Sequence, residues 1–224
     1  PIGTDFTFVE LTPSIPTVFE YDPGQFAFVS FRSKIVDREP HPFTLSSTPS
    51  RPEALQFTIR TSGDWTRTVK LISRGDQALI QGPFGRFGHL FITNNQELIM
   101  IAGGIGITPM LSMLRFMADH RDQRPVTLIW SNRTPEQVVY ADEMDALSTK
   151  LTGLRWIPIF TIEAKTGNRA KSLDRGALKM LLNNNSRGSA VFVCGPPKMM
   201  TQVKTDLKAL GFPARSIFTE VFGF

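Results

Sequence analysis

The sequence predicts a β + α/β protein, with a six-stranded antiparallel barrel over residues 1–95 and a Rossmann-like parallel-sheet domain over residues 96–224. Two observations lead to this fold class. Short stretches rich in Phe, Val, Ile and Thr, separated by turn signals, fill the first half. Strand-like and helix-like stretches then alternate, which is typical of a parallel sheet with helices on both faces. The boundary is expected at the polar turn Asn94-Asn95.

The first half carries six predicted strands and one helix. The strands are Thr7–Leu11, Thr17–Tyr21, Gln25–Phe31, Phe43–Ser47, Leu55–Arg60 and Gln77–Gln81. Short strands at this spacing favour a small antiparallel barrel. The helix is expected to begin with Asp64 as its N-cap and to place Trp65 and Val69 at helical spacing.

The second half alternates between the two kinds of element. Its predicted strands are Glu97–Ala102, Val126–Ser131, Leu154–Thr161, Ala190–Cys194 and Ser216–Glu220. Its predicted helices are Pro109–Asp119, Glu136–Leu147, Leu178–Leu182 and Lys198–Leu210. The polar stretch Lys165–Arg175 is expected to be a loop.

Composition excludes several classes of protein. The chain has 224 residues, of which 41% are hydrophobic and 20% charged, so it is neither disordered nor fibrous. Its single cysteine, Cys194, excludes an internal disulfide and a metal or iron–sulfur site built from several cysteines. The three histidines lie far apart in the sequence, so no metal site is expected. The longest apolar run, Leu98–Ile107, is shorter than the about 20 residues that a membrane-spanning helix needs.

Charge and the first residues bear on partners. The net charge is +5 and the pI about 9.6, but the basic residues are scattered, so nucleic acid is not an expected partner. Anionic nucleotide cofactors, or the cytoplasmic side of a membrane, explain the excess equally well. The chain opens with Pro1, carries no signal-peptide pattern and runs almost at once into a strand-like stretch. We therefore expect a piece of a longer protein.

A glycine-rich stretch follows the first predicted strand of the second half. Gly103, Gly104 and Gly106 allow a tight turn and a close approach of ligand phosphates. Thr108 as N-cap and Pro109 at the first helical position would begin a helix whose free N–H groups and dipole favour a pyrophosphate. A turn that only needs positive φ angles is the alternative.

The stretch Cys194-Gly195-Pro196 repeats this strand–turn–helix pattern. Ligands of doubly wound sheets bind at the carboxyl ends of the strands, so both loops are expected to face one crevice. Cys194 would then be a half-exposed thiol that lines the site. Alternatively, it is a small buried hydrophobic residue at a strand end.

Two motifs in the first half suit a flat ligand and a phosphate. In His41-Pro42-Phe43-Thr44, a phenyl ring can cover a planar heteroaromatic ring, and a hydroxyl can bond one of its nitrogens. Phe43 as a plain core residue is the alternative. Arg60 precedes Gly63-Asp64-Trp65-Thr66, where a helix N-terminus would form a second phosphate site, unless Arg60 is only a surface residue.

Six motifs together carry a family resemblance over essentially the whole chain. They are His41-Pro42-Phe43-Thr44, Gly63-Asp64-Trp65-Thr66, Gly82-Pro83-Phe84-Gly85, Gly103–Pro109, Cys194-Gly195-Pro196 and Glu220-Val221-Phe222. The set resembles the ferredoxin–NADP reductase superfamily and looks most like the dehydrogenase domain of NADPH oxidases and ferric reductases. The resemblance implies an FAD-binding barrel, an NAD(P)H-binding sheet and hydride transfer between the two cofactors.

The resemblance also implies roles on the flavin side. Phe43 matches the aromatic residue that packs on the flavin isoalloxazine, and Thr44 matches the hydroxyl near flavin N5, where the hydride arrives. His41, beside Pro42, stands where many reductases carry an arginine that faces the FAD pyrophosphate. Arg60 and the amides of Gly63–Thr66 should therefore matter more in this chain.

On the nucleotide side, Gly103–Pro109 matches the loop under the pyrophosphate. Cys194 matches the thiol beside the nicotinamide, and Glu220 matches the acidic group near the reacting atoms. Phe222 matches the aromatic residue that covers the other flavin face and moves aside for nicotinamide. The chain continues past Phe222, so Phe224 competes for this role.

The electron donor and the electron acceptor are predicted from fewer residues than the cofactor sites. Arg133 stands where an arginine can pair with a 2′-phosphate, and no acidic residue stands there, so the prediction leans to NADPH over NADH. Arg133 as a solvated loop residue is the alternative. The resemblance points to haem as the acceptor, in an N-terminal transmembrane domain of the parent protein, with this chain at the cytoplasmic face of the membrane. The alternatives are a cytoplasmic soluble reductase serving a ferredoxin or hydroxylase partner, and a nucleotide-sensing module without redox chemistry.

Overall fold

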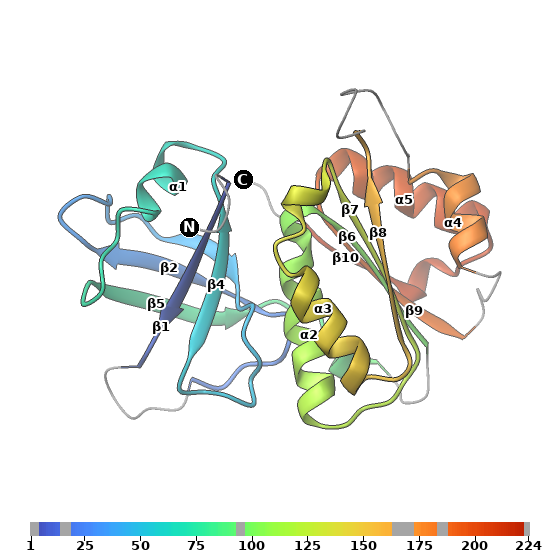
Figure 1. Cartoon of the computed structure of the whole chain (residues 1–224), viewed down its shortest axis with the longest axis horizontal. Helices are drawn as coiled ribbons and strands as arrows, with labels where there is room; N and C mark the ends of the chain where they lie inside the picture. The colour runs from blue at the N-terminus through green and yellow to red at the C-terminus, as the bar shows by residue number, and fades with distance from the viewer. Residues whose placement is uncertain (1–4, 14–18, 93–96, 163–172, 183–187, 222–224) are drawn as a thin grey trace.

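A computed structural model describes residues 5–13, 19–92, 97–162, 173–182 and 188–221, and it shows a β-rich half beside an α/β half (Figure 1). The expected boundary at Asn94-Asn95 lies outside the described residues. None of the helices described is long and apolar enough to cross a bilayer.

Two antiparallel sheets form the β-rich half. One sheet pairs β1 with β4, and the other has the order β3-β2-β5. The strands are β1 (Phe6–Leu11), β2 (Phe26–Arg32), β3 (His41–Thr44), β4 (Leu55–Arg60) and β5 (Gln77–Phe84), and α1 (Asp64–Val69) precedes β5. A bridge between Leu45 and Phe57 links the two sheets. Alternate residues of the strands, among them Val29, Phe57 and Ile59, are buried in one apolar core together with Leu45, which follows β3.

Three expectations for this half need correction. Phe19–Tyr21, the described part of the predicted strand Thr17–Tyr21, is not a strand. The predicted strand Phe43–Ser47 ends at Thr44, because the chain leaves the sheet there and Ser46 and Ser47 turn to the other half of the molecule. The N-cap of α1 is Gly63 and not Asp64.

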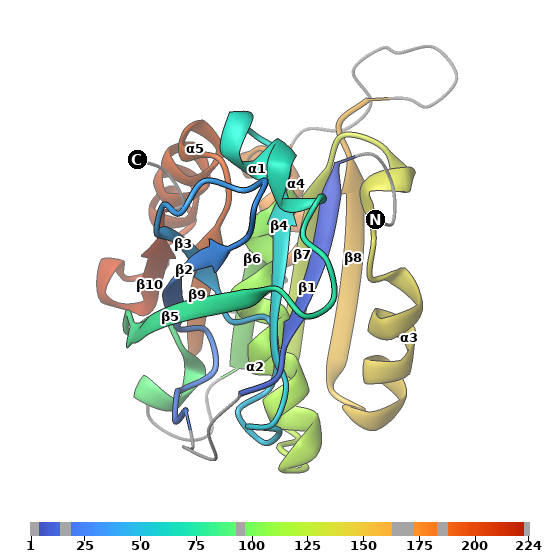
Figure 2. The same ribbon diagram turned by 90° about the vertical axis from the view of Figure 1, so that its left-hand side faces the viewer.

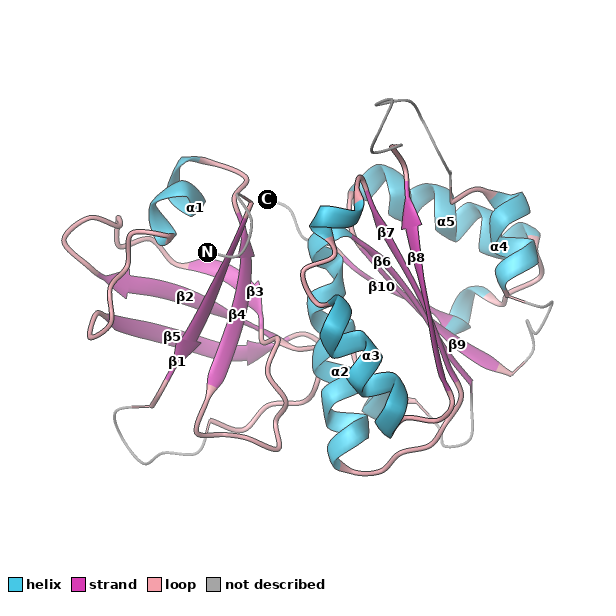
Figure 3. Cartoon of the chain, in the orientation of Figure 1, coloured by secondary structure: helices cyan, strands magenta, loops and turns pink. Residues whose placement is uncertain are grey.

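The second half is a five-stranded parallel sheet with helices on both faces (Figure 3). The strand order is β10-β9-β6-β7-β8, so the direction of winding reverses between β6 and β9. The strands are β6 (Glu97–Gly103), β7 (Val126–Asn132), β8 (Leu154–Phe160), β9 (Ser189–Cys194) and β10 (Ile217–Glu220). The central strands are near-continuous apolar runs because both of their faces are covered. The predicted antiparallel-then-parallel organisation is confirmed.

Within the described residues, four α-helices cover this sheet. They are α2 (Ile107–Asp119), α3 (Ala141–Lys150), α4 (Arg175–Leu181) and α5 (Pro197–Ala209). Helices α2 and α3 pack on the face that carries Leu98 and Met100, and α4 and α5 pack on the opposite face. Helix α2 lies between the sheet and the β-rich half, as Figures 1 and 2 show from two sides.

The starts of α3 and α4 differ most from prediction. The helix expected from Glu136 begins at Ala141, after a separate 3-10 turn over Pro135–Gln137, and the non-helical link between them lets Tyr140 reach Thr58. Helix α4 begins at Arg175, three residues earlier than expected, because the Asp174 carboxylate caps it by accepting the N–H of Ala177 at 2.9 Å. The rest of the expected loop up to residue 172 lies outside the described residues.

Candidate active site

A cleft of about 630 Å³ opens where the β-rich half meets the carboxyl edge of the parallel sheet. This volume is in the usual range for cofactor sites. The predicted site residues that line it are His41, Pro42, Phe43, Thr44, Arg60, Thr66, Gly103, Thr108, Gly195, Pro196 and Glu220. They come from both halves of the chain, so the cleft exists only because the two halves pack together.

Strand β3 places an aromatic wall and a hydroxyl in the cleft. Phe43 and Thr44 are its last two residues, and both line the cleft. The Trp65 ring lies behind this wall, 5.9 Å from the Phe43 ring and 4.0 Å from the His41 ring, measured between centroids. The Trp65 indole donates to the Asp37 carbonyl at 2.8 Å. Trp65 therefore supports His41 and Phe43 from outside the lining.

Arg60 supplies positive charge between the halves. It ends β4, and its Nη1 lies 3.3 Å from where a Cβ on Gly104 would stand. No ion-pair partner for Arg60 occurs among the residues that the structure describes. The guanidinium is thus available to an anionic ligand at the junction.

The turn after β4 differs from the expected amide cradle. Thr66 Oγ1 accepts the backbone N–H groups of Ser62 at 2.8 Å and of Gly63 at 2.9 Å. Asp64 is exposed and pairs with Arg67. Gly63, Asp64 and Trp65 are not among the residues that line the cleft, whereas Ser62 and Thr66 are.

Two glycine loops meet at the carboxyl ends of β6 and β9. A Cβ on Gly106 would lie 2.3 Å from the Cys194 carbonyl oxygen, and a Cβ on Gly195 would lie 2.9 Å from the Gly103 Cα. Gly104 has φ +52°, a conformation that glycine adopts easily. Backbone packs directly on backbone here, and the loops form a cradle that side chains would fill.

Helix α2 begins earlier than expected. The 3-10 turn Gly104–Gly106 runs directly into it, so its N-cap is Gly106 and not Thr108. Thr108 lies in the first turn, where its hydroxyl donates to the Ile105 carbonyl at 3.1 Å. Pro109 is buried in the same turn, where its missing N–H has no helical partner to lose, and it is not part of the lining. The free amides and the dipole of a 13-residue helix still point to the cleft end.

Cys194 is fully buried, and the expectation of a half-exposed thiol is wrong. It ends β9 beneath the Gly106 turn, which covers its carbonyl. Burial, and then the nearby Glu220 carboxylate, raise the pKa of the Cys194 thiol. The thiol therefore stays protonated at neutral pH and contributes shape to the site, with no nucleophilic role.

Glu220 ends β10, in register with Cys194 on β9. Its half-buried side chain lines the cleft, and burial raises its pKa above the ordinary 4.5. Because the folded-state pKa is the higher one, the folded protein binds more protons than the unfolded chain between the two values. The stability that Glu220 contributes is therefore complete below about pH 4.5 and is lost as pH rises through the raised pKa.

Replacing this carboxylate tests the assignment. In Glu220→Gln, the free energy of unfolding should fall less steeply with rising pH above about 4.5 than in the unmodified protein. Urea unfolding measured across that pH interval gives both slopes. Identical slopes would show that Glu220 titrates alike in the folded and unfolded chains.

Some lining residues carry no signal in the sequence. Phe26, Thr58 and Ser62 line the cleft but belong to no motif. Ile105 and Val221 also line it; they lie inside the motifs Gly103–Pro109 and Glu220-Val221-Phe222, but no role was predicted for them. Thr58 and Ser62 lie within two residues of Arg60 along the chain, whereas Phe26 enters the site only through its pairing with Thr44.

The residue predicted to select the nucleotide donor lies outside the cleft lining. Arg133 is exposed and outside the lining, and its backbone N–H donates to Gln137 at 3.1 Å. Phe222 and Phe224 lie outside the described residues. Beside Arg133, Asn132 is buried at the carboxyl end of β7, and its side-chain nitrogen and oxygen have no hydrogen-bond partner among the described residues. Buried amides are normally bonded, so this one fits a polar group of a ligand.

These features define a class of protein. A cation, an aromatic wall with a hydroxyl, and a helix N-terminus behind glycine loops together suit an anionic dinucleotide with a flat ring. No cluster of three or more metal-ligating side chains occurs within the described ranges. The fold and the cleft are those of a two-part flavin and nicotinamide-nucleotide reductase.

Comparison with known families agrees with this class. Residues 4–101 match the model of an FAD-binding domain, and residues 100–205 match the model of an oxidoreductase NAD-binding domain. The chain belongs to the ferredoxin–NADP reductase superfamily. It is a flavin-dependent oxidoreductase chain whose cofactors are FAD and a nicotinamide nucleotide.

Individual relatives share about three in ten residues with this chain. The reductase component of propane 2-monooxygenase from Rhodococcus jostii is 28% identical over 99% of this chain and 61% of its own length. NADH oxidoreductase HCR from Escherichia coli is 31% identical over 94% of this chain and 66% of its own length. The chain thus spans just under two thirds of the length of these curated relatives.

Solved structures share the fold. A flavohemoglobin from Malassezia yamatoensis superposes with a TM-score of 0.84 at 23% identity, over 100% of this chain and 57% of its own. A ferredoxin NADP+ reductase from Neisseria gonorrhoeae, with FAD and NADP bound, gives 0.81 at 19% identity, over 97% of this chain and 92% of its own.

Proposed function

We propose that this chain is the reductase module of an electron-transfer system: it takes hydride from NAD(P)H onto FAD and passes single electrons to a separate protein partner. The observation that carries the proposal is the junction cleft, where the aromatic wall and Arg60 of one half face the glycine loops of the other. When bound, FAD supplies the conversion of a two-electron donor into one-electron steps.

The residues of the chain bind and orient. Phe43 provides an apolar surface for a flat ring, and Thr44 provides the hydroxyl for a ring nitrogen. Arg60 offsets phosphate charge, and His41 and Pro42 line the same cleft. The amides of the α2 N-terminus, reached through Gly103 and Gly106, hold the second pyrophosphate. Alignment of two bound rings supplies most of the rate advantage, because no side chain needs to act as a nucleophile.

The remaining predicted residues have supporting roles in this proposal. Gly195 and Pro196 bound the nicotinamide end of the cleft, and buried Cys194 shapes the floor beneath them. Glu220 places a carboxyl group that can take up and release a proton at the same end of the cleft. Phe222, or Phe224 in its place, covers the flavin face and gives way to nicotinamide. The FAD-binding domain is proposed to span residues 1–95 and the NAD(P)H-binding domain residues 96–224.

Donor choice is proposed to depend on the loop after β7. Exposed Arg133 is free to approach a 2′-phosphate, which favours NADPH. We propose that buried Asn132, whose side-chain amide has no partner among the described residues, bonds the same end of the nucleotide.

Relatives support an acceptor protein of the oxygenase kind. Several are named as reductase components or subunits, of propane 2-monooxygenase and of glycine betaine monooxygenase among others. They favour a separate oxygenase or ferredoxin partner, in the cytoplasm, over haem in an attached membrane domain, which the motif resemblance alone suggested.

An anaerobic titration tests the proposal. The chain supplemented with FAD should show bleaching of the flavin absorbance band on addition of NADPH or NADH, and the lower half-saturation identifies the donor. An iron–sulfur protein should then be reduced faster than ferricyanide-type acceptors at equal driving force. Flavin binding without bleaching by either nucleotide would contradict hydride transfer in this chain, and reduction of free dyes alone would contradict the protein acceptor.

A further inference from the structure

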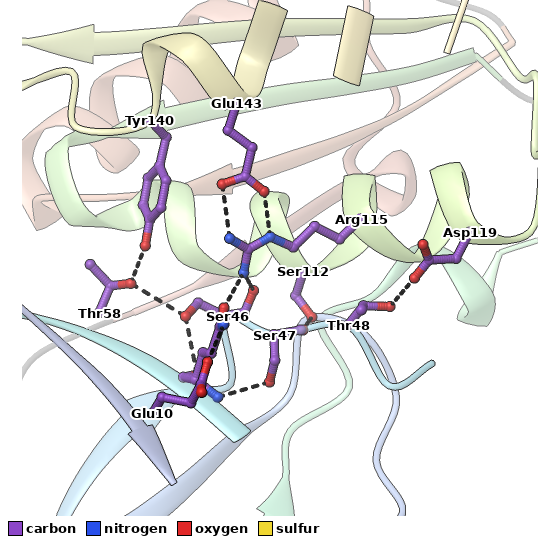
Figure 4. A network of polar contacts seen from close by, with 11 residues as sticks. Glu10, Ser46, Ser47, Thr48, Thr58, Ser112, Arg115, Asp119, Tyr140 and Glu143 are labelled. Atoms are coloured by element: carbon purple, nitrogen blue, oxygen red, sulfur yellow. Dashed lines mark hydrogen bonds and ion pairs between the residues drawn. The ribbon is translucent and has the colours of Figure 1, made fainter. Parts of the chain in front are cut away.

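Away from the cleft, a network of polar contacts joins the β-rich half to the parallel-sheet half (Figure 4). The Ser112 hydroxyl donates to the Ser47 carbonyl at 2.6 Å, and Arg115 Nη1 donates to the Ser46 carbonyl at 2.6 Å. The Thr48 hydroxyl donates to the Asp119 carboxylate at 2.9 Å. We call these three contacts the interdomain clamp. Each joins the segment after β3 to helix α2.

The spacing of the three clamp contacts allows only one alignment of helix α2 against the segment after β3. Residues 112, 115 and 119 lie on one face of α2, while residues 46, 47 and 48 are consecutive in the segment that follows β3. Sliding or rotating one half over the other would break all three contacts together. Ser46, Ser47, Thr48 and Ser112 are buried, so lost hydrogen bonds would leave polar groups without water.

Arg115 is the centre of the clamp. Its Nε and Nη2 bond both carboxylate oxygens of Glu143 on α3, at 2.6 and 2.8 Å. Nη1 also donates to the Gln56 side chain of β4 at 2.9 Å. One guanidinium therefore ties two helices of the parallel-sheet half to a strand and a loop of the β-rich half. A bidentate pair of this kind fixes orientation as well as distance.

The clamp is continuous with both sides of the cleft. Ser46 follows Thr44 of the cleft wall by two residues, and α2 begins directly after the Gly104–Gly106 turn. Arg115 lies seven residues beyond Thr108 along α2, which is about 10 Å of rigid helix. The relative position of the Thr44 hydroxyl and the α2 N-terminus is therefore set by the clamp.

We infer that Arg115 is a positioning residue for hydride transfer: the clamp holds the flavin half and the nucleotide half at the separation and angle that the reaction needs. The inference rests on the proposed function. Arg115 is outside the cleft lining, so it acts through α2 and the segment after β3.

The central variant is Arg115→Gln, and its matched control is Arg124→Gln. Arg124 also forms a largely buried ion pair, with Asp122 at 2.6 Å, but both partners belong to the parallel-sheet half. The Arg115 and Arg124 side chains are exposed to a similar extent, 17% and 14%. Any general cost of breaking an ion pair should therefore appear in both variants.

Kinetics should separate the variants. In Arg115→Gln, the limiting rate of flavin bleaching at saturating nucleotide should fall roughly 10-fold, while the Kd for FAD stays near that of the unmodified protein. Arg124→Gln should keep the limiting rate, and Arg115→Lys should recover part of it. Equal losses in the Arg115 and Arg124 variants, or no loss in Arg115→Gln, would overturn the inference.

A distance measurement tests the clamp without any flavin chemistry. Spin labels at Lys70→Cys and Lys208→Cys, both exposed and in different halves, report the interdomain distance, and buried Cys194 should stay unlabelled. Arg115→Gln should broaden the distance distribution, whereas Arg124→Gln should not. If Arg115→Gln fails to fold, Ser112→Ala removes one contact of the clamp and carries the same expectation. An unchanged distance distribution in Arg115→Gln would overturn the role of the clamp. If the wild-type distribution is narrow but nucleotide does not bleach the flavin band, the proposed function is contradicted and the clamp is not.

Discussion

In Gly106→Ala, the rate of NAD(P)H-dependent flavin reduction should fall roughly 100-fold. The free energy of unfolding should fall by about 1–3 kcal/mol. A Cβ at this position would stand 2.3 Å from the Cys194 carbonyl oxygen and 2.8 Å from the Gly195 nitrogen. Both contacts are to backbone, so no side-chain rotation relieves them. The two glycine loops must separate, and the nucleotide cradle then loses its alignment with the flavin half.

Stopped-flow bleaching of the flavin band and urea unfolding measure the two effects of this substitution. Gly63→Ala is the matched control, because a Cβ there meets nothing within 4 Å and the residue is in extended conformation. That control should reduce flavin at the wild-type rate. Wild-type kinetics in Gly106→Ala itself would show that the contact between the loops is not needed for the reaction.

Arg60→Met should weaken FAD binding by about 1.5–3 kcal/mol, which is roughly 10- to 150-fold in Kd. The substitution keeps most of the side-chain volume and removes the charge. Arg60 lines the cleft and has no ion-pair partner within the described parts of the chain, so its charge is free for a phosphate. Quenching of flavin fluorescence on binding gives Kd directly.

The control for this prediction is Arg67→Met in the same half of the molecule. Arg67 is exposed on α1, pairs with Asp64 and is not part of the cleft lining. Arg67→Met changes the net charge by the same amount as Arg60→Met, so long-range electrostatics should affect FAD binding alike in both variants. Similar FAD affinities for the two variants would exclude a direct Arg60–phosphate contact.

Much of the fold could be predicted because its signals are local. The central strands β6 and β9 are short apolar runs, and glycines directly follow both, so their place in a parallel sheet follows from a few consecutive residues. The helix starts were less predictable. Helix α4 depends on a cap at Asp174, and the link before α3 bends so that Tyr140 can reach Thr58 in the other half.

The candidate site divides in the same way. Gly103 could be predicted because a glycine-rich motif places it at the carboxyl end of a parallel strand, where ligands bind in such sheets. Phe43 and Thr44 could be predicted because a phenyl ring next to a hydroxyl suits a flat heteroaromatic ring. The burial of Cys194 could not, because the Gly106 turn that covers it lies far away in the sequence. Trp65 likewise has the residue type of a ligand-binding side chain, yet it packs behind Phe43 and His41.

The order of the two halves, the glycine loops and the class of cofactor follow from the amino-acid sequence, because they depend on neighbouring residues and on local conformational preference. Which side chains face the cleft and which join the halves depends on packing between distant parts of the chain. The clamp contacts connect residues 65, 69 and 71 positions apart, and no local pattern encodes such pairs. They form because packing buries polar groups at the junction, and a buried polar group requires a partner.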